Sequence, residues 1–102
     1  MGLSVRDRLL IELGISANET DKVALAENAL WQAGEYIKEK RRSNEVESRF
    51  EFIQFQIAVR LWNIRGIEGE TEHTENGVKR SYSNDGVIAD LMRKVPAPVI
   101  VG

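Results

Sequence analysis

The sequence predicts an all-α domain, a small array of about four helices with a long loop or β-hairpin between the third helix and the last. Apolar residues recur every three or four positions over most of the chain, which is the spacing of one helix face. Capping and turn residues stand where this spacing stops, and the spacing is absent from 66–85. The 102 residues are the length of one ordinary domain, so we expect residues 1–102 to share a single core.

The first predicted helix is short and carries a signal at each end. Ser4 precedes a run in which Val5, Leu9 and Leu13 recur at helical spacing. A serine in this position can accept a hydrogen bond from an N–H of the first turn, and Gly14 can adopt the left-handed conformation that ends many helices. These residues predict a helix over 5–13.

The second predicted helix follows a polar, cap-like segment at 18–21. Its apolar repeat runs from Val23 toward Lys40 and includes alanines, which allow another helix to approach closely. The sequence KEKRR at 38–42 places cations in the last turn, where they offset the negative end of the helix dipole. Helix capping alone can explain this basic run, and DNA phosphates are the alternative partner.

The third predicted helix covers about 45–65 and would be the longest, at about 31 Å for a rise of 1.5 Å per residue. Asn44 with Glu47 three residues later is typical of a capping box. One apolar stripe consists of Val46, Phe50, Ile53, Ile57, Leu61 and Ile64. A second stripe consists of Phe52, Phe55, Val59 and Trp62. Because one stripe suffices for a core, the second is either a subunit interface or a surface that other helices of the chain cover.

The segment 66–85 is rich in glycine and acidic residues. Asn76 and Gly77 favour a type I′ turn, so 71–75 and 78–82 could pair as an exposed hairpin. Its four glutamates are Glu68, Glu70, Glu72 and Glu75.

A last short helix is predicted after this segment. Asn84 or Asp85 can cap it, and Pro96 follows its apolar residues and cannot continue a helix. The apolar tail at 99–101 could lie on its own core or extend onto a neighbouring subunit.

The sequence offers little for catalysis or for metal binding. It has no cysteine, and the single histidine, His73, stands among glutamates without the second histidine of a helical metal motif. The glutamates of 66–85 could bind a divalent cation in a metal-dependent hydrolase, but such a pattern more often forms a solvated surface. We therefore expect no enzymatic activity, no cofactor and no metal site.

The charge balance argues against general binding of nucleic acid. The formal net charge is -2, whereas nucleic-acid binders usually carry an excess of Lys and Arg. A small helical DNA-binding or regulatory protein, using 38–42 and the helix at 45–65, remains the alternative function.

Charged residues occupy 6–8, where a signal peptide needs an apolar run, and no apolar stretch reaches the roughly 20 residues of a membrane span. We expect neither export by that route nor a membrane span.

The segment 60–85, RLWNIRGIEGETEHTENGVKRSYSND, resembles the helix end and loop of bacteriophage head-tail connector proteins, a family of adaptors also described as phage DNA-packaging proteins. The residues at the family's spacing are Gly66, Glu68, Gly69, Gly77, Val78, Arg80, Ser81 and Tyr82. The opening VRDRLLIELGI at 5–15 and TDK at 20–22 are similar too, and the resemblance covers the whole chain in order and length. The chain departs from the family's serines and second glycine at Thr71, Glu72, His73 and Asn76. These departures bear on the detailed role of the loop.

The resemblance implies a structural protein of the virion that acts through its shape. It would form a ring, about twelvefold, under the portal, extend the DNA channel and dock the next head-completion or tail protein. Its partners would be other copies of itself, the portal protein, that next protein, and passing DNA held without sequence specificity. It would be assembled in the bacterial host cytoplasm and reside at the head-tail junction.

A ring built from head-to-tail contacts needs two different faces on each subunit. The candidate residues for one face are Phe52, Phe55, Val59 and Trp62. The loop residues expected to contact the channel or the portal are Glu68, Glu70, Glu72, Glu75, Lys79, Arg80 and Tyr82. In a channel, the glutamates would repel phosphate and keep DNA sliding.

Overall fold

The computed structural model describes residues 2–67 and 85–98, and this part of the chain is helical without strands. The all-α prediction is confirmed, and these described residues form four α-helices and one 3-10 turn. The elements are α1 (Val5–Leu13), α2 (Thr20–Arg41), η1 (Ser48–Phe50), α3 (Glu51–Ile67) and α5 (Gly86–Arg93). The predicted hairpin at 71–75 and 78–82 lies outside the described residues.

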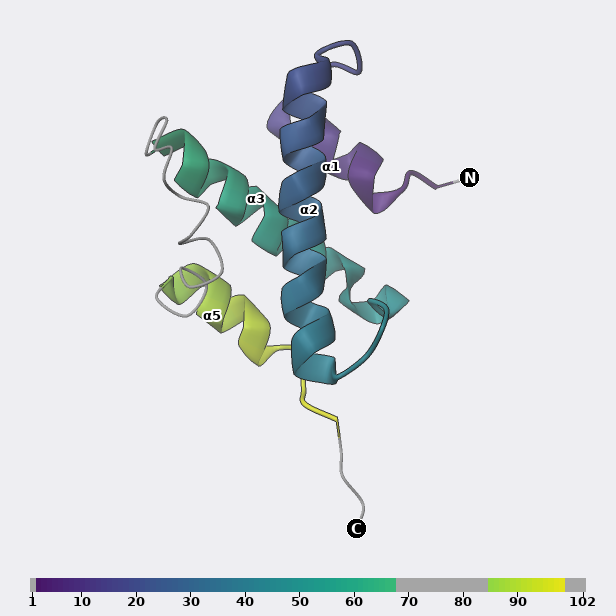
Figure 1. Ribbon diagram of the computed structural model, residues 1–102, viewed down its shortest axis with the longest axis vertical. Helices are drawn as coiled ribbons and strands as arrows, with labels where there is room; N and C mark the ends of the chain where they lie inside the picture. Colours follow the sequence, from purple (N-terminus) through teal and green to yellow (C-terminus); the bar gives the residue numbers. More distant parts are fainter. Residues whose placement is uncertain (1, 68–84, 99–102) are drawn as a thin grey trace.

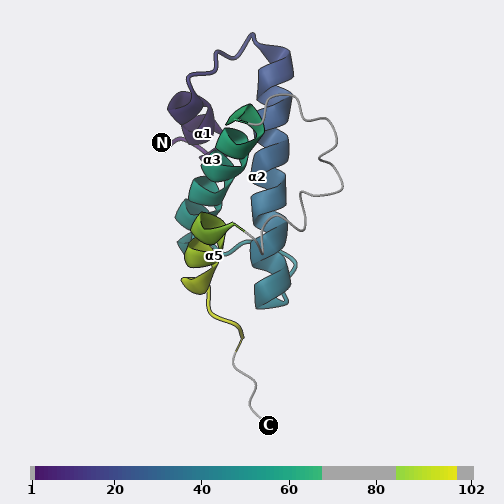
Figure 2. The same cartoon turned by 90° about the vertical axis from the view of Figure 1, so that its left-hand side faces the viewer.

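The helices form two layers. In Figure 1, α2 crosses in front of α1 and α3, and Figure 2 shows that α1, α3 and α5 all lie on one side of α2. The shortest dimension of the molecule is 20 Å, which is the thickness of two packed helices of about 10 Å each. Since α3 contacts α1, α2 and α5, it is the central element of its layer. The protein is therefore a thin plate with two broad faces.

The ends of α1 form as predicted. The Ser4 hydroxyl accepts a hydrogen bond from the Asp7 N–H at 3.0 Å, and Gly14 has a φ of 72° with its N–H bonded to carbonyls of the last turn. The start of α2 differs in detail, because Glu19 is the cap residue but makes no side-chain cap. Its carboxylate instead accepts from the Ser16 N–H at 2.8 Å, which fixes the turn before the helix.

The predicted start of the third helix is wrong. The helix was expected over 45–65 with a capping box between Asn44 and Glu47, but the chain becomes helical only at η1, and α3 begins at Glu51. The backbone of Glu47 is extended, with φ -66° and ψ 148°, and its side chain makes no cap.

Two arginines account for this difference, since they compete with the backbone for the Glu47 carboxylate. Arg41 donates to Glu47 Oε2 at 3.2 Å, and Arg49 donates to Oε1 at 2.8 Å. Both guanidinium groups also lie over the ring of Phe50, at 5.4 and 4.7 Å from its centroid. These hydrogen bonds from Arg49 and Arg41 lower the pKa of Glu47 and keep its carboxylate away from a helix N-terminus.

Small residues on α2 allow close packing with α3. Ala26, Ala33 and the other buried alanine of this face leave room for the partner helix, as the sequence predicted. Gly34 lies at a close approach of the two helices, because an added Cβ would lie 2.8 Å from the Gln54 amide nitrogen. That nitrogen donates to the Leu30 carbonyl oxygen at 2.9 Å. The buried apolar core comprises Leu9, Leu10, Ile15, Val23, Ala26, Ala29, Ala33, Tyr36, Ile37, Phe50, Ile57, Ala58, Leu61, Ile88, Leu91, Met92 and Val95.

Candidate functional site

The residues predicted as the first stripe of the third helix face the core, but Val46 and Phe50 lie before α3 begins and only the other four are on that helix. Phe50, Ile57 and Leu61 are buried, and the remaining members, Val46, Ile53 and Ile64, are half-buried against them. This stripe packs against the alanine-rich face of α2 and holds the two layers together.

The second stripe is only partly free. Phe52 is 66% exposed, whereas Phe55, Val59 and Trp62 are half-buried and pack against the core. The continuous aromatic surface that the sequence suggested is thus reduced to its first turn. There the rings of Phe52 and Phe55 stack with centroids 6.0 Å apart and planes inclined by 16°.

A groove opens beside these two rings, between the N-terminal segment and the start of α3. Its volume is about 430 Å³. The apolar side chains that line it are Leu3, Val5, Phe52 and Phe55, and the polar ones are Arg8, Ser48 and Glu51. Leu3 and Phe52 are both exposed, so the groove presents apolar surface to solvent at its mouth. An apolar centre with a few polar groups at the edge is the usual composition of a protein-binding surface.

Phe52 belongs to the broad face that points away from α2. It lies five residues before the buried Ile57 and nine before the buried Leu61, so it is rotated by about 140° and 180° from them around the axis of α3. Because Ile57 and Leu61 belong to the face packed on α2, Phe52 faces outward.

Trp31 is a second exposed aromatic residue, and sequence reasoning missed it. It is 60% exposed in the middle of α2. It follows the buried Ala26 by five residues and is therefore rotated by about 140° from the face that packs on α3. The signal was present in the sequence, because Trp31 falls outside the apolar repeat of this helix.

Most cations of the basic run at 38–42 form hydrogen bonds or ion pairs with other groups of the same chain. Lys38 pairs with Glu35 at 2.7 Å, one turn earlier on α2. Lys40 Nζ donates to the Met92 carbonyl oxygen at 2.7 Å, and Arg41 donates to that of Pro96 at 2.8 Å. These bonds satisfy carbonyls at and after the last turn of α5. The run therefore fastens the C-terminal part of the domain.

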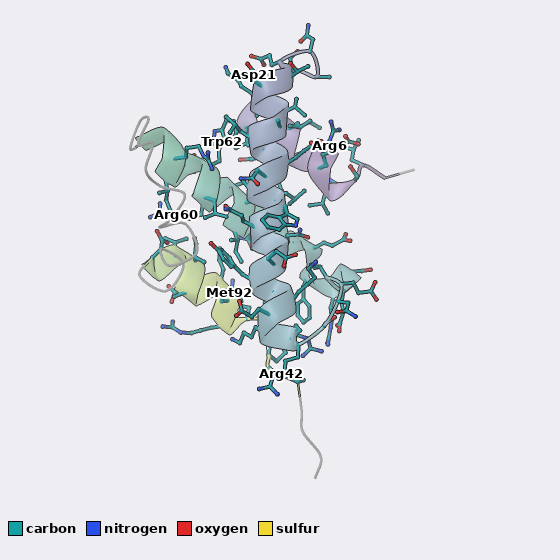
Figure 3. All side chains as sticks on the ribbon, in the orientation of Figure 1. Arg6, Asp21, Arg42, Arg60, Trp62 and Met92 are labelled. Carbon is teal, nitrogen blue, oxygen red and sulfur yellow. The ribbon has the colours of Figure 1, made fainter. Side chains whose placement is uncertain are left out.

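An ion pair joins α3 to the first turn of α5. Arg60 donates to both carboxylate oxygens of Asp85, at 3.0 to 3.2 Å, and lies between the two helices in Figure 3. Asp85 is also the N-cap of α5, because its carboxylate accepts from the Ile88 N–H at 3.0 Å. Hydrogen bonding from Arg60 is the main cause that holds the pKa of Asp85 below its usual value, and the Ile88 N–H adds to it against the effect of burial.

The predicted loop residues lie outside the described part of the chain. They are Glu68, Glu70, Glu72, His73, Glu75, Lys79, Arg80 and Tyr82. Within residues 2–67 and 85–98, no group of three His, Asp or Glu side chains is placed to hold a metal ion. No helix in that part combines the length and the apolar character needed to cross a bilayer.

Comparison of the chain with protein-family models, with curated protein sequences and with solved structures gives no match.

Proposed function

We propose that this chain is a structural protein of virion assembly, a head-tail connector that forms a ring under the portal. The ring would extend the DNA channel and dock the next head-completion or tail protein. The resemblance over 60–85 and in the order of the helices supports this reading. The structural observation that carries it is the pair of exposed aromatic residues, Trp31 and Phe52, on the two broad faces of a thin plate.

Two apolar contact points on opposite faces suit a ring because ring contacts are heterologous. Each subunit offers one surface to the neighbour on one side and a different surface to the neighbour on the other. Phe52 and Phe55 supply an exposed aromatic pair for one contact, and the more covered Val59 and Trp62 extend the same stripe. Aromatic side chains in such positions commonly carry most of the binding energy of an interface.

The arrangement of the basic run disfavours the DNA-binding alternative. Three of its four cations, Lys38, Lys40 and Arg41, already bond to Glu35 and to carbonyls at the end of α5. A salt titration of duplex binding tests this directly, since a phosphate binder loses affinity steeply as salt rises. We expect weak binding or none at physiological salt, and tight, strongly salt-dependent binding would favour the alternative.

The first experiment is the solution mass of the purified protein over a concentration series, by native mass spectrometry, with and without portal protein. We expect a ring-sized species, in free solution or on the portal. Phe52→Ser should reduce this species, because it removes an aromatic side chain of the proposed contact. The side chain is mostly exposed, so its removal should leave the core intact. The matched control is Ile11→Ser, which removes an apolar residue of nearly the same exposure, 67% against 66% for Phe52, that does not line the groove. A protein that stays monomeric under both conditions contradicts the proposed function.

The acidic segment allows a separate test of where the DNA passes. Changing its four glutamates to glutamine would remove the repulsion that we assign to the channel wall. The positions are Glu68, Glu70, Glu72 and Glu75. We expect rings to form normally while genome retention or DNA passage changes. If both stay at the wild-type level, the segment does not line the channel.

A further inference from the structure

We infer that Trp31 of one copy occupies the groove beside Phe52 of the next copy, in a head-to-tail contact. This inference rests on the proposed function for its ring, and it adds the second half of the interface. The groove accounts for one of the two faces that a heterologous contact requires, and Trp31 supplies the other.

The groove and the indole are matched in size and character. A volume of about 430 Å³ lies toward the lower end of the range for binding pockets, roughly 300–1,000 Å³, and is ample for one large side chain. The stacked rings of Phe52 and Phe55 offer an aromatic wall, against which an indole can pack edge-on or offset. Leu3 and Val5 add aliphatic surface to the lining of the groove.

Charged side chains border both surfaces. The groove carries Arg8 and Glu51, and no salt bridge within the described part of the chain engages either of them. Near Trp31, Glu27 lies one helical turn before it and pairs with Arg6, and Lys38 lies two turns after it and pairs with Glu35. Arg8 and Glu51 could pair with Glu27 and Lys38 of the next copy only by sharing or exchanging these partners, so such pairs would orient the contact rather than supply its affinity.

The shape of the protein allows the contact to repeat. Because Trp31 and the groove lie on opposite faces, copies bound in this way always leave one free Trp31 and one free groove, so the assembly grows until it closes. A standard interface buries about 800 Å² on each partner, and a broad face of a molecule 50 by 38 Å across can supply that area.

A mixing experiment tests this inference. Trp31→Ser keeps the groove but lacks the inserting side chain, and Phe52→Ser keeps Trp31 but has a damaged groove. Both residues are exposed, so both variants should keep the helical circular dichroism and thermal midpoint of the wild type. Alone, each variant should show at least a tenfold weaker self-association. An equimolar mixture should form dimers and nothing larger, because the one intact groove binds the one intact tryptophan.

The possible outcomes distinguish a wrong inference about Trp31 from a wrong proposed function. If Trp31→Ser assembles like wild type while Phe52→Ser does not, the groove has another occupant and the inference is wrong, although the proposed ring survives. A mixture that stays monomeric while the wild type assembles also overturns the inference. If the wild type itself never assembles, with or without portal protein, the proposed function fails together with it. Ile11→Ser should behave as wild type throughout.

Fluorescence provides an independent readout. In a Trp62→Phe background, Trp31 is the sole tryptophan, and its emission should shift to the blue as assembly removes it from water. Unshifted emission across an assembly transition observed by mass would overturn the inference.

Discussion

Replacing Asp85 by asparagine separates two roles of this residue, the cap of α5 and the partner of Arg60. Asparagine caps a helix as well as aspartate does, so Asp85→Asn should keep the bond from the Ile88 N–H and lose the charge-assisted pair. Hydrogen bonds to charged groups contribute about 1.5–3 kcal/mol each when well shielded. The side chain of Asp85 is 12% exposed but that of Arg60 is 34% exposed, so solvent screening reduces the expected loss to about 1 kcal/mol.

Asp85→Ala removes the cap as well and should cost about 2 kcal/mol in total, since losing a cap typically costs about 1 kcal/mol. Urea unfolding followed by circular dichroism measures both variants. For a domain of this size, each 1 kcal/mol lowers the thermal midpoint by about 4–8 °C. Arg60→Gln should match Asp85→Asn, and the double variant should lose little more than either single variant.

The same pair predicts a dependence on pH. The pKa of Asp85 is lowered in the folded state, so its contribution is fully present above the unfolded value of about 3.9 and is lost as the pH falls through the lower folded value. The difference in unfolding free energy between wild type and Asp85→Asn should therefore be constant near neutrality and shrink in acid below about pH 4. Equal stability of the two proteins at neutral pH, or a difference that acid leaves unchanged, would refute this reasoning.

Three further changes test the packing, each by urea unfolding. Gly34→Ala should be nearly neutral, because a helix-propensity gain of about 1 kcal/mol offsets the loss of the Gln54 hydrogen bond. In a Gln54→Ala background the same change should stabilise the protein by about 1 kcal/mol. If Gly34→Ala does not stabilise that background, the close approach of Gln54 to Gly34 is contradicted. Arg41→Lys should cost about 1–2 kcal/mol although it keeps the charge, because lysine has no planar guanidinium to lie over the Phe50 ring while it donates to the Pro96 carbonyl oxygen. Wild-type stability of this variant would mean that the positive charge alone accounts for the contribution of Arg41. Ile57→Ala should cost about 3–4 kcal/mol, and a loss under 1 kcal/mol would mean that the site is not fully packed.

Local signals in the sequence predicted local structure well. Ser4 and Gly14 act on backbone groups within one turn of themselves, so their sequence context contains nearly all that determines the cap. The same is true of Asp85, one of the two caps proposed for the last helix. The cap proposed at Asn44 failed because Arg41, on the preceding helix, takes the partner carboxylate of Glu47. That contact depends on how the chain turns after α2, which no local pattern specifies.

The candidate interface shows the corresponding limit for surfaces. Helical spacing placed Phe52, Phe55 and Trp62 on one stripe, but their coverage depends on where the other helices lie. Phe55 shares its groove with Val5, and Phe52, on the outer side of the same turn, stays in solvent. Trp31 was missed because the prediction looked for apolar stripes, whereas its signal is a single aromatic residue off the apolar repeat of α2. The acidic residues of 68–84 lie outside the described residues, so their predicted role stays a prediction.

The Arg60 to Asp85 pair has a consequence for how such a protein can change. It fastens the start of α5 to the middle of α3, two helices that also pack against each other. Both residues belong to the described helices and their caps, so the pair should hold α5 against α3 in any variant that keeps Arg60 and Asp85. The entropic cost of joining two fixed points rises only with the logarithm of the number of residues between them, by about 0.6 kcal/mol for each doubling. A change in the number of residues between Ile67 and Asp85 should therefore cost little stability as long as the pair is kept.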